Sequence, residues 1–139
     1  MRHTPVIVSL PIVDRQVSYD FYRDALGLDV VGEAAEDGLP EPLQFEVNDG
    51  LRLMLVPTGG FGWVLGGREV ADSRHSECVL GLSATSSDEV DGLVKRALEA
   101  GAEVVTEPGQ QPWGYAGTFA DPDGHLWMVA VAGRPSGQT

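Results

Sequence analysis

Two ten-residue segments decide the fold: FEVNDGLRLM at residues 45–54 and FADPDGHLWM at residues 119–128. They lie 74 residues apart (119 minus 45), and each combines strand-forming residues with a polar turn. Sliding the sequence by the same offset pairs further identities, which fall at helix starts, helix ends and strand interiors. These are Ser9 with Ser83, Asp14 with Asp88, Gly27 with Gly101, and Val30-Val31 with Val104-Val105. The chain is therefore predicted to be an internal repeat of one unit.

Each half has the same predicted order of elements, strand–helix–strand–strand–strand. The predicted strands cover residues 6–13, 28–31, 43–47 and 51–56 in the first half, and 79–84, 104–105, 115–120 and 126–131 in the second. Asp14 and Gly27 are predicted to bound the first helix, while Ser86 begins the second in a capping box and Gly101 ends it. This order predicts an α+β fold of two βαβββ modules, which form a curved mixed sheet around a cleft with the helices outside.

The repeat also predicts the domain organisation. We expect a single domain over residues 1–139, because a chain of this length can bury a real core. Its predicted parts are module one at about 5–57, a linker and lid at about 58–76, module two at about 77–132, and a flexible tail at 133–139.

Composition excludes several classes of protein. A formal net charge of -12 leaves little basic surface for a nucleic-acid backbone. No apolar run approaches the ~18 residues of a membrane span, and the N-terminus does not resemble a signal peptide. The one cysteine, Cys78, has no intrachain disulfide partner and is expected to be an inert core thiol. These features predict a cytoplasmic protein without nucleic-acid or membrane partners.

Several motifs resemble those of the vicinal-oxygen-chelate superfamily, the group of glyoxalases, bleomycin resistance proteins and extradiol dioxygenases. FYRDALGL at 21–28 resembles the first-module signature FYRDxLGL, and residues 87–91 and 97–101 resemble the second-module helix. WGY at 113–115 and the segment 119–127 are similar to the closing signature FxDPDGHLWE. The resemblance covers about residues 6–131 and implies a single-domain, two-module member that assembles as a homodimer.

The resemblance also implies a metal site, but its ligands are missing here. Family members hold a divalent metal through His or Gln on the first strand of each module and a carboxylate on the last. The corresponding positions are Ile7, then Gly81 or Leu82, and finally Met54 and Met128. Aliphatic side chains offer no lone pair, and a thioether is a poor ligand for hard or borderline ions. We therefore predict no metal and no cofactor.

A small-molecule cleft is predicted instead. If Met54 and Met128 face it, as the resemblance implies, they form an adaptable apolar floor; otherwise they fill a closed core. Strand alternation puts Arg52 beside Met54, where it can bind an anion or pair with Glu46. Aromatic residues can wall the cleft, although aromatic residues in strands are also common in cores. The predicted cleft residues are Ile7, Ser9, Phe45, Arg52, Met54, Phe61, Trp63, Gly81, Ser83, Trp113, Tyr115, Phe119 and Met128.

Three functions fit this pattern. The first is a metal-free protein that sequesters an aromatic or hydrophobic ligand, such as an antibiotic, as in the bleomycin-resistance branch. The alternative is a glyoxalase-like lyase, isomerase or dioxygenase, either without metal or with a non-standard site built from His75, Glu77 or Glu46. A third is a protein with a closed cleft that acts only through protein interactions. No catalytic residue is identified, and His125 is expected to hold the DPDGH turn.

Overall fold

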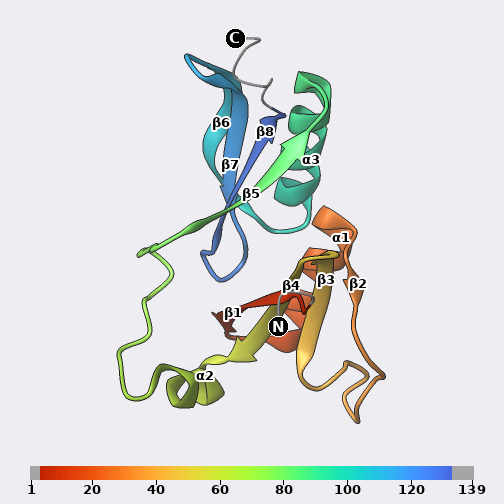
Figure 1. Cartoon of the computed structure of the whole chain (residues 1–139), viewed down its shortest axis with the longest axis vertical. Helices are drawn as coiled ribbons and strands as arrows, with labels where there is room; N and C mark the ends of the chain where they lie inside the picture. The colour runs from red at the N-terminus through yellow and green to blue at the C-terminus, as the bar shows by residue number, and fades with distance from the viewer. Residues whose placement is uncertain (1–3, 133–139) are drawn as a thin grey trace.

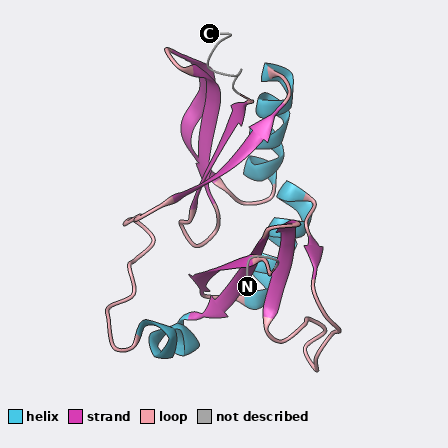
Figure 2. Cartoon of the chain, viewed as in Figure 1, coloured by secondary structure: helices cyan, strands magenta, loops and turns pink. Residues whose placement is uncertain are grey.

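Two modules of the same topology make up the protein (Figures 1 and 2). The computed structural model describes residues 4–132, so the predicted flexible tail at 133–139 lies outside the described residues. Module one contains β1 (Val6–Ile12), α1 (Arg15–Leu26), β2 (Asp29–Val30), β3 (Leu43–Asn48) and β4 (Leu51–Pro57). Helix α2 (Thr58–Leu65) follows in the linker, and module two contains β5 (Val79–Ala84), α3 (Ser87–Glu99), β6 (Glu103–Gln111), β7 (Gly114–Ala120) and β8 (Leu126–Val131).

Each module has its own four-stranded mixed sheet. The strand orders are β1-β4-β3-β2 and β5-β8-β7-β6, so the second sheet repeats the first. The first strand of each module runs parallel to the last, and the remaining pairs are antiparallel. The predicted fold class, two βαβββ modules with curved sheets, is confirmed.

Local capping explains where both main helices begin. The Asp14 carboxylate accepts the N–H of Val17 at 3.0 Å, and the Ser86 hydroxyl accepts the N–H of Glu89 at 3.1 Å. Each cap satisfies a backbone donor that the first turn of a helix leaves free. Helix α1 ends at Gly27, whose φ of 64° is the left-handed conformation that glycine adopts without strain.

Two elements differ from the prediction. The linker contains helix α2, which was not predicted. Its sequence TGGFGWVL is rich in glycine, and glycine has a low helix propensity. Strand β6 continues to Gln111, well beyond the predicted Val104-Val105. The register of β6 on β7 shifts twice before Gly109, so the strand lacks the regular alternation that would reveal it.

The two modules share one hydrophobic core although their sheets are separate. Helices α1 and α3 pack together, and Figure 1 shows the modules end to end with the linker running along one side. The Phe21 ring lies 6.3 Å from that of Phe119, and the Tyr22 ring lies 6.0 Å from that of Trp127. All four side chains are almost fully buried, so the first helix completes the core of the second module.

A buried polar network lies inside this shared core. The Asp121 carboxylate accepts the Tyr22 hydroxyl and, at 2.9 Å each, the backbone N–H groups of Asp123 and His125. The Trp127 indole N–H in turn donates to the Tyr22 oxygen at 3.1 Å. Burial raises the pKa of Asp121, and it also raises the pKa of Tyr22 well above its usual value. The network therefore joins α1 to the turn before β8.

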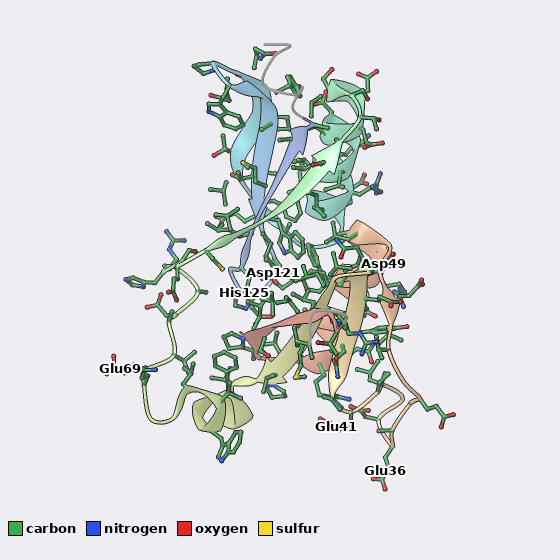
Figure 3. The ribbon with its side chains drawn as sticks, viewed as in Figure 1. Glu36, Glu41, Asp49, Glu69, Asp121 and His125 are labelled. Carbon is green, nitrogen blue, oxygen red and sulfur yellow. The ribbon has the colours of Figure 1, made fainter. Side chains whose placement is uncertain are left out.

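The same turn makes three more contacts with module one, and we call the set the turn contacts. Asp123 accepts the backbone N–H of Val13 at 3.0 Å and the Ser18 hydroxyl at 3.3 Å. The Nε2 atom of His125 lies 2.6 Å from the Pro11 carbonyl oxygen. Figure 3 shows His125 and Asp121 at the junction of the modules. His125 thus bonds to the other module as well as within its own turn.

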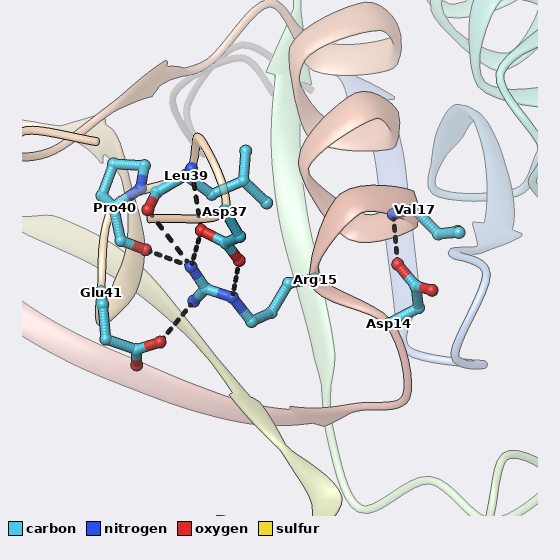
Figure 4. Close-up of polar contacts among 7 residues, drawn as sticks. All are labelled: Asp14, Arg15, Val17, Asp37, Leu39, Pro40 and Glu41. Carbon is cyan, nitrogen blue, oxygen red and sulfur yellow. Dashed lines mark hydrogen bonds and ion pairs between the residues drawn. The ribbon is translucent and has the colours of Figure 1, made fainter. Parts of the chain in front are cut away.

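Arg15 fixes the long loop between β2 and β3 to the start of α1 (Figure 4). Its guanidinium lies 3.0 Å from the Asp37 carboxylate and 3.2 Å from that of Glu41, and it donates to the Pro40 carbonyl at 2.8 Å. The hydrogen bond from Arg15 lowers the pKa of Asp37, so this carboxylate stays ionised to a lower pH than a free aspartate does.

Within residues 4–132, no helix is both long and apolar enough to span a membrane.

Candidate functional site

The first sheet has a surface opposite the one that packs on the core, and we call it the module-one face; α2 contacts β1 and β4 near Val56, at one end of this surface. Strand register places Ser9 and Gln44 on either side of Met54, and Glu46 opposite Arg52. Alternation directs these side chains away from the buried face of the sheet, which packs on the core. The module-one face consists of Ile7, Ser9, Gln44, Glu46, Arg52 and Met54.

The second sheet has the equivalent module-two face. Gly81 and Thr118 lie on either side of Met128 in the register. Leu82 instead pairs with Val129, which is buried in the core. Of the two alternative ligand positions, Gly81 is therefore the one that shares a face with Met128. The module-two face consists of Gly81, Ser83, Thr118, Met128 and Ala130.

Both faces are partly open. Ile7 is 47% exposed, and Met54 and Met128 are half-buried and lie outside the core. The alternative in which the two methionines fill a closed core is therefore wrong. Two polarisable side chains at equivalent places on open sheet faces are suited to an apolar ligand or protein surface.

Unpartnered polar atoms concentrate on these faces. Across residues 4–132, four buried side-chain nitrogen or oxygen atoms lack a hydrogen bond, and three of them are Gln44 Oε1, Arg52 Nε and Thr118 Oγ1. Gln44 and Thr118 are the direct cross-strand neighbours of Met54 and Met128. A buried polar atom without a partner costs roughly 1–3 kcal/mol.

Arg52 has no ion-pair partner within residues 4–132. Among the described residues it forms no ion pair, even with Glu46, which lies opposite it in the register. The predicted alternative of an Arg52–Glu46 pair is therefore not observed. Its guanidinium is available to a carboxylate or another anion.

Three aromatic residues predicted to line the cleft lie on the helix side of their sheets. Phe45 and Phe119 are fully buried in the core, and Phe119 pairs with Trp127 across β7 and β8. Tyr115 has the same parity as Phe119, and its hydroxyl donates to Asp91 of α3 at 2.6 Å. The prediction was wrong because it gave these residues the cleft side of β7, while the register gives that side to Thr118.

The two exposed tryptophans also fail to line either face. Trp63 is 88% exposed on α2, and Trp113 is 64% exposed at the β6–β7 turn. Cys78, expected in the core, is exposed instead. Sequence reasoning also missed Gln44 and Thr118, whose placement follows from the hairpin register and from no motif.

A cavity of about 370 Å³ lies between the modules, beneath the linker. Of the residues that were predicted to line the cleft, only Ser9 and Phe61 line this cavity. The structure therefore does not bring Met54 and Met128 together in this cavity. It is lined by residues 8–11 of β1, Phe61 and Leu65 of α2, linker residues 69–72 and 75–78, Leu80, and the turn residues 123–126.

The residues present do not fit a metal of the family type. In the part of the chain that the structure describes, no three His, Cys, Asp or Glu side chains are grouped closely enough to hold an ion. The alternative ligands His75, Glu77 and Glu46 therefore form no cluster. His75 is instead bound to its neighbour Asp72, with Nδ1 and Oδ1 2.6 Å apart in an exposed turn.

Solved structures of the same architecture are known. A glyoxalase-related enzyme from Fulvimarina pelagi is 28% identical, with a TM-score of 0.77 over 91% of this chain and 86% of that chain. A hypothetical protein from S. aureus is 27% identical, with a TM-score of 0.76 over 89% and 90%. A glyoxalase/bleomycin resistance protein/dioxygenase family enzyme from Burkholderia phytofirmans PsJN is 16% identical, has a TM-score of 0.73 over 90% and 95%, and shows the shared fold alone.

No curated protein matches the chain. The family profile described as Glyoxalase/Bleomycin resistance protein/Dioxygenase superfamily matches residues 5–129, which include both modules and the linker. This match agrees with the repeated βαβββ topology and with the motifs at 21–28 and 119–127. The chain belongs to the glyoxalase/bleomycin resistance protein/dioxygenase superfamily.

Proposed function

We propose that this protein binds an aromatic or hydrophobic small molecule without a metal and sequesters it, as an antibiotic-binding protein would. The single observation that carries the proposal is the pair of open sheet faces that carry Met54 and Met128, at positions where the family resemblance implies carboxylate ligands. A thioether contacts apolar and aromatic groups well and is a poor partner for hard cations. The proposal includes a cytoplasmic location, because Cys78 is the chain's one cysteine and has no intrachain partner.

Arg52 supports a ligand with an anionic end. Its side chain stands two residues from Met54 on the same face, and among the described residues it has no ion-pair partner. A carboxylate on an aromatic ligand would pair with the guanidinium while the ring contacts the methionine.

A second copy of the chain is the proposed means of enclosing the ligand. Within one chain the two sheets are separate, and the modules meet through α1, α3 and the turn contacts rather than through their faces. In a homodimer the module-one face of one copy can lie over the module-two face of its partner. Such pairing would cover Ile7 and both methionines and would form two equivalent sites.

Metal addition tests the first part of the proposal. After dialysis against a chelator, we expect Ni²⁺, Zn²⁺, Mn²⁺ and Fe²⁺ to leave the melting temperature unchanged. Among the described residues, no three His, Cys, Asp or Glu side chains lie close enough together to hold an ion. Specific binding to the folded state would raise the melting temperature. A specific rise, with about one metal per chain by elemental analysis, would contradict the proposal and favour a metal enzyme.

A ligand pair tests the role of Arg52. We expect 2-naphthoate to bind more tightly than 2-naphthylmethanol, and Arg52→Gln to weaken naphthoate binding about tenfold through loss of a charge-assisted bond. Calorimetric titration of the full chain measures both constants. Arg96→Gln on α3 is the matched control, since it removes one positive charge from a helix surface. If both substitutions have the same effect, Arg52 does not bind the anion.

A further inference from the structure

The cavity beneath the linker meets the module-one face at Ser9 and otherwise lies outside both open faces. None of Gln44, Arg52, Met54, Thr118 and Met128 lines it. Its volume of about 370 Å³ lies within the range of roughly 300–1,000 Å³ typical of small-molecule pockets. The cavity can therefore hold a ligand in a place that contains neither Arg52 nor either methionine.

Apolar side chains form much of the cavity wall. Phe61 and Leu65 of α2, Val70 of the linker, and Leu80 and Leu126 of module two all line it. They come from three separate segments of the chain, so the wall exists only in the folded protein. Such a surface favours a ligand with an aromatic or aliphatic body.

The charged groups around this wall are mainly acidic. Asp72, Glu77 and Asp123 line the cavity, and no Lys or Arg side chain is among its lining residues. Glu69 also belongs to the lining segment, but Figure 3 shows its side chain pointing away from the protein. The cavity thus combines an apolar wall with an excess of negative charge.

The acidic residues differ in what they already bind. Asp123 holds Val13 and Ser18 of module one, and Asp72 accepts hydrogen bonds from its own turn. Among the described residues, Glu77 makes no hydrogen bond or ion pair through its side chain, which is exposed to the solvent. A carboxylate in this state attracts a cation at the mouth of the cavity.

Two histidines also face this space. The Nε2 atom of His125 lies 2.6 Å from the Pro11 carbonyl, and Nδ1 of His75 lies 2.6 Å from Asp72. Each ring thus has one nitrogen engaged by an oxygen of the protein. Neither ring offsets the negative charge while it is neutral.

We propose that the cavity beneath the linker is a second binding site, which takes a small organic cation with an apolar body. The apolar body lies against Phe61, Leu65 and Leu126, and the positive charge lies near Glu77. Charge therefore separates the two sites of the protein: the face that carries Arg52 takes an anionic ligand, and the cavity takes a cationic one.

Benzyltrimethylammonium is the probe, with benzyl alcohol and phenylacetate as neutral and anionic counterparts. Backbone amide NMR shifts of the full chain at low salt give both the dissociation constant and the location of the bound probe. We expect saturable binding that is tightest for the cation, with shifts centred on Phe61, Leu80 and Leu126. Equal binding of phenylacetate, or shifts centred on Met54 and Met128 alone, would overturn the proposal.

Three variants test which residues are responsible for binding the cation. Glu77→Lys is expected to weaken cation binding roughly fivefold or more, because it places a like charge beside the ligand. Glu99→Lys is the matched control; it makes the same change of charge on the exposed end of α3 and should not alter binding. Ala71→Trp, at an exposed lining position, should fill the cavity and abolish binding while the melting temperature shows that the protein still folds.

These variants also separate this proposal from the proposed function. Equal effects of Glu77→Lys and Glu99→Lys, or full binding by Ala71→Trp, would show that the cation does not occupy the cavity. Loss of naphthoate binding in Arg52→Gln, with unchanged binding of benzyltrimethylammonium, would show two independent sites. Failure of naphthoate to bind at all would contradict the proposed function and leave the result for the cavity intact.

Discussion

Replacing Asp121 with alanine is expected to lower the free energy of unfolding by about 3 kcal/mol. The carboxylate is 4% exposed and accepts the Tyr22 hydroxyl together with two backbone N–H groups. Alanine would leave these donors without partners inside the shared core, and a buried unsatisfied donor retains the cost of its lost hydration. Urea unfolding at neutral pH, followed by circular dichroism, measures the change.

The protein contains a matched control for this substitution. Asp91 also accepts a tyrosine hydroxyl, that of Tyr115, but it does so at the surface. Water can replace this lost acceptor, so Asp91→Ala should change the stability by no more than about 0.5 kcal/mol. Similar losses for both variants would mean that burial of the Tyr22–Asp121 bond does not set its contribution.

Gly124→Ala is expected to destabilise the protein by about 2–4 kcal/mol and to displace the linker. At this position φ is 90°, and an added Cβ would overlap the carbonyl oxygen of Ser73 and lie 2.8 Å from its Cα. Both costs fall on backbone that side-chain rotation cannot relieve. Denaturant unfolding measures the loss, and faster protease cleavage within residues 66–78 would report the displaced linker.

Gly27→Ala separates the two costs of the Gly124 substitution. Gly27 has a φ of 64°, but nothing lies within 4 Å of an added Cβ. This variant should therefore show only the conformational cost, about 1 kcal/mol. If Gly124→Ala costs no more than Gly27→Ala, the close approach of the linker to the turn does not contribute to stability.

Much of the fold can be predicted from the sequence because repetition and capping are local signals. The 74-residue offset, Asp14, Ser86 and Gly27 identify the elements, and the structure has the predicted helix starts and strand order. Helix α2 escapes prediction because contacts made by Phe61 hold a glycine-rich segment that has little helix propensity of its own.

The candidate site is harder to predict because it depends on which side of a strand faces the core. Arg52 and Met54 share one face of the first sheet, as simple alternation in β4 predicts. Tyr115 and Phe119 were not, since an aromatic side chain satisfies a core position and a ligand wall equally well. The pairing of Phe119 with Trp127 places Phe119 on the core side of the sheet, and this pairing depends on the three-dimensional fold rather than on local sequence.

The bonds between α1 and the DPDGH turn also affect when the protein can fold during its synthesis. Tyr22 and Asp121 are 99 residues apart in the chain, and Pro11 and His125 are 114 apart. During synthesis, the amino-terminal module must leave the ribosome long before its partners in the turn exist. Until then, the apolar side of α1 that will pack on module two is exposed to the solvent. We therefore expect the nascent chain to engage chaperones until about residue 127 has emerged, after which both halves gain their structure in one cooperative step.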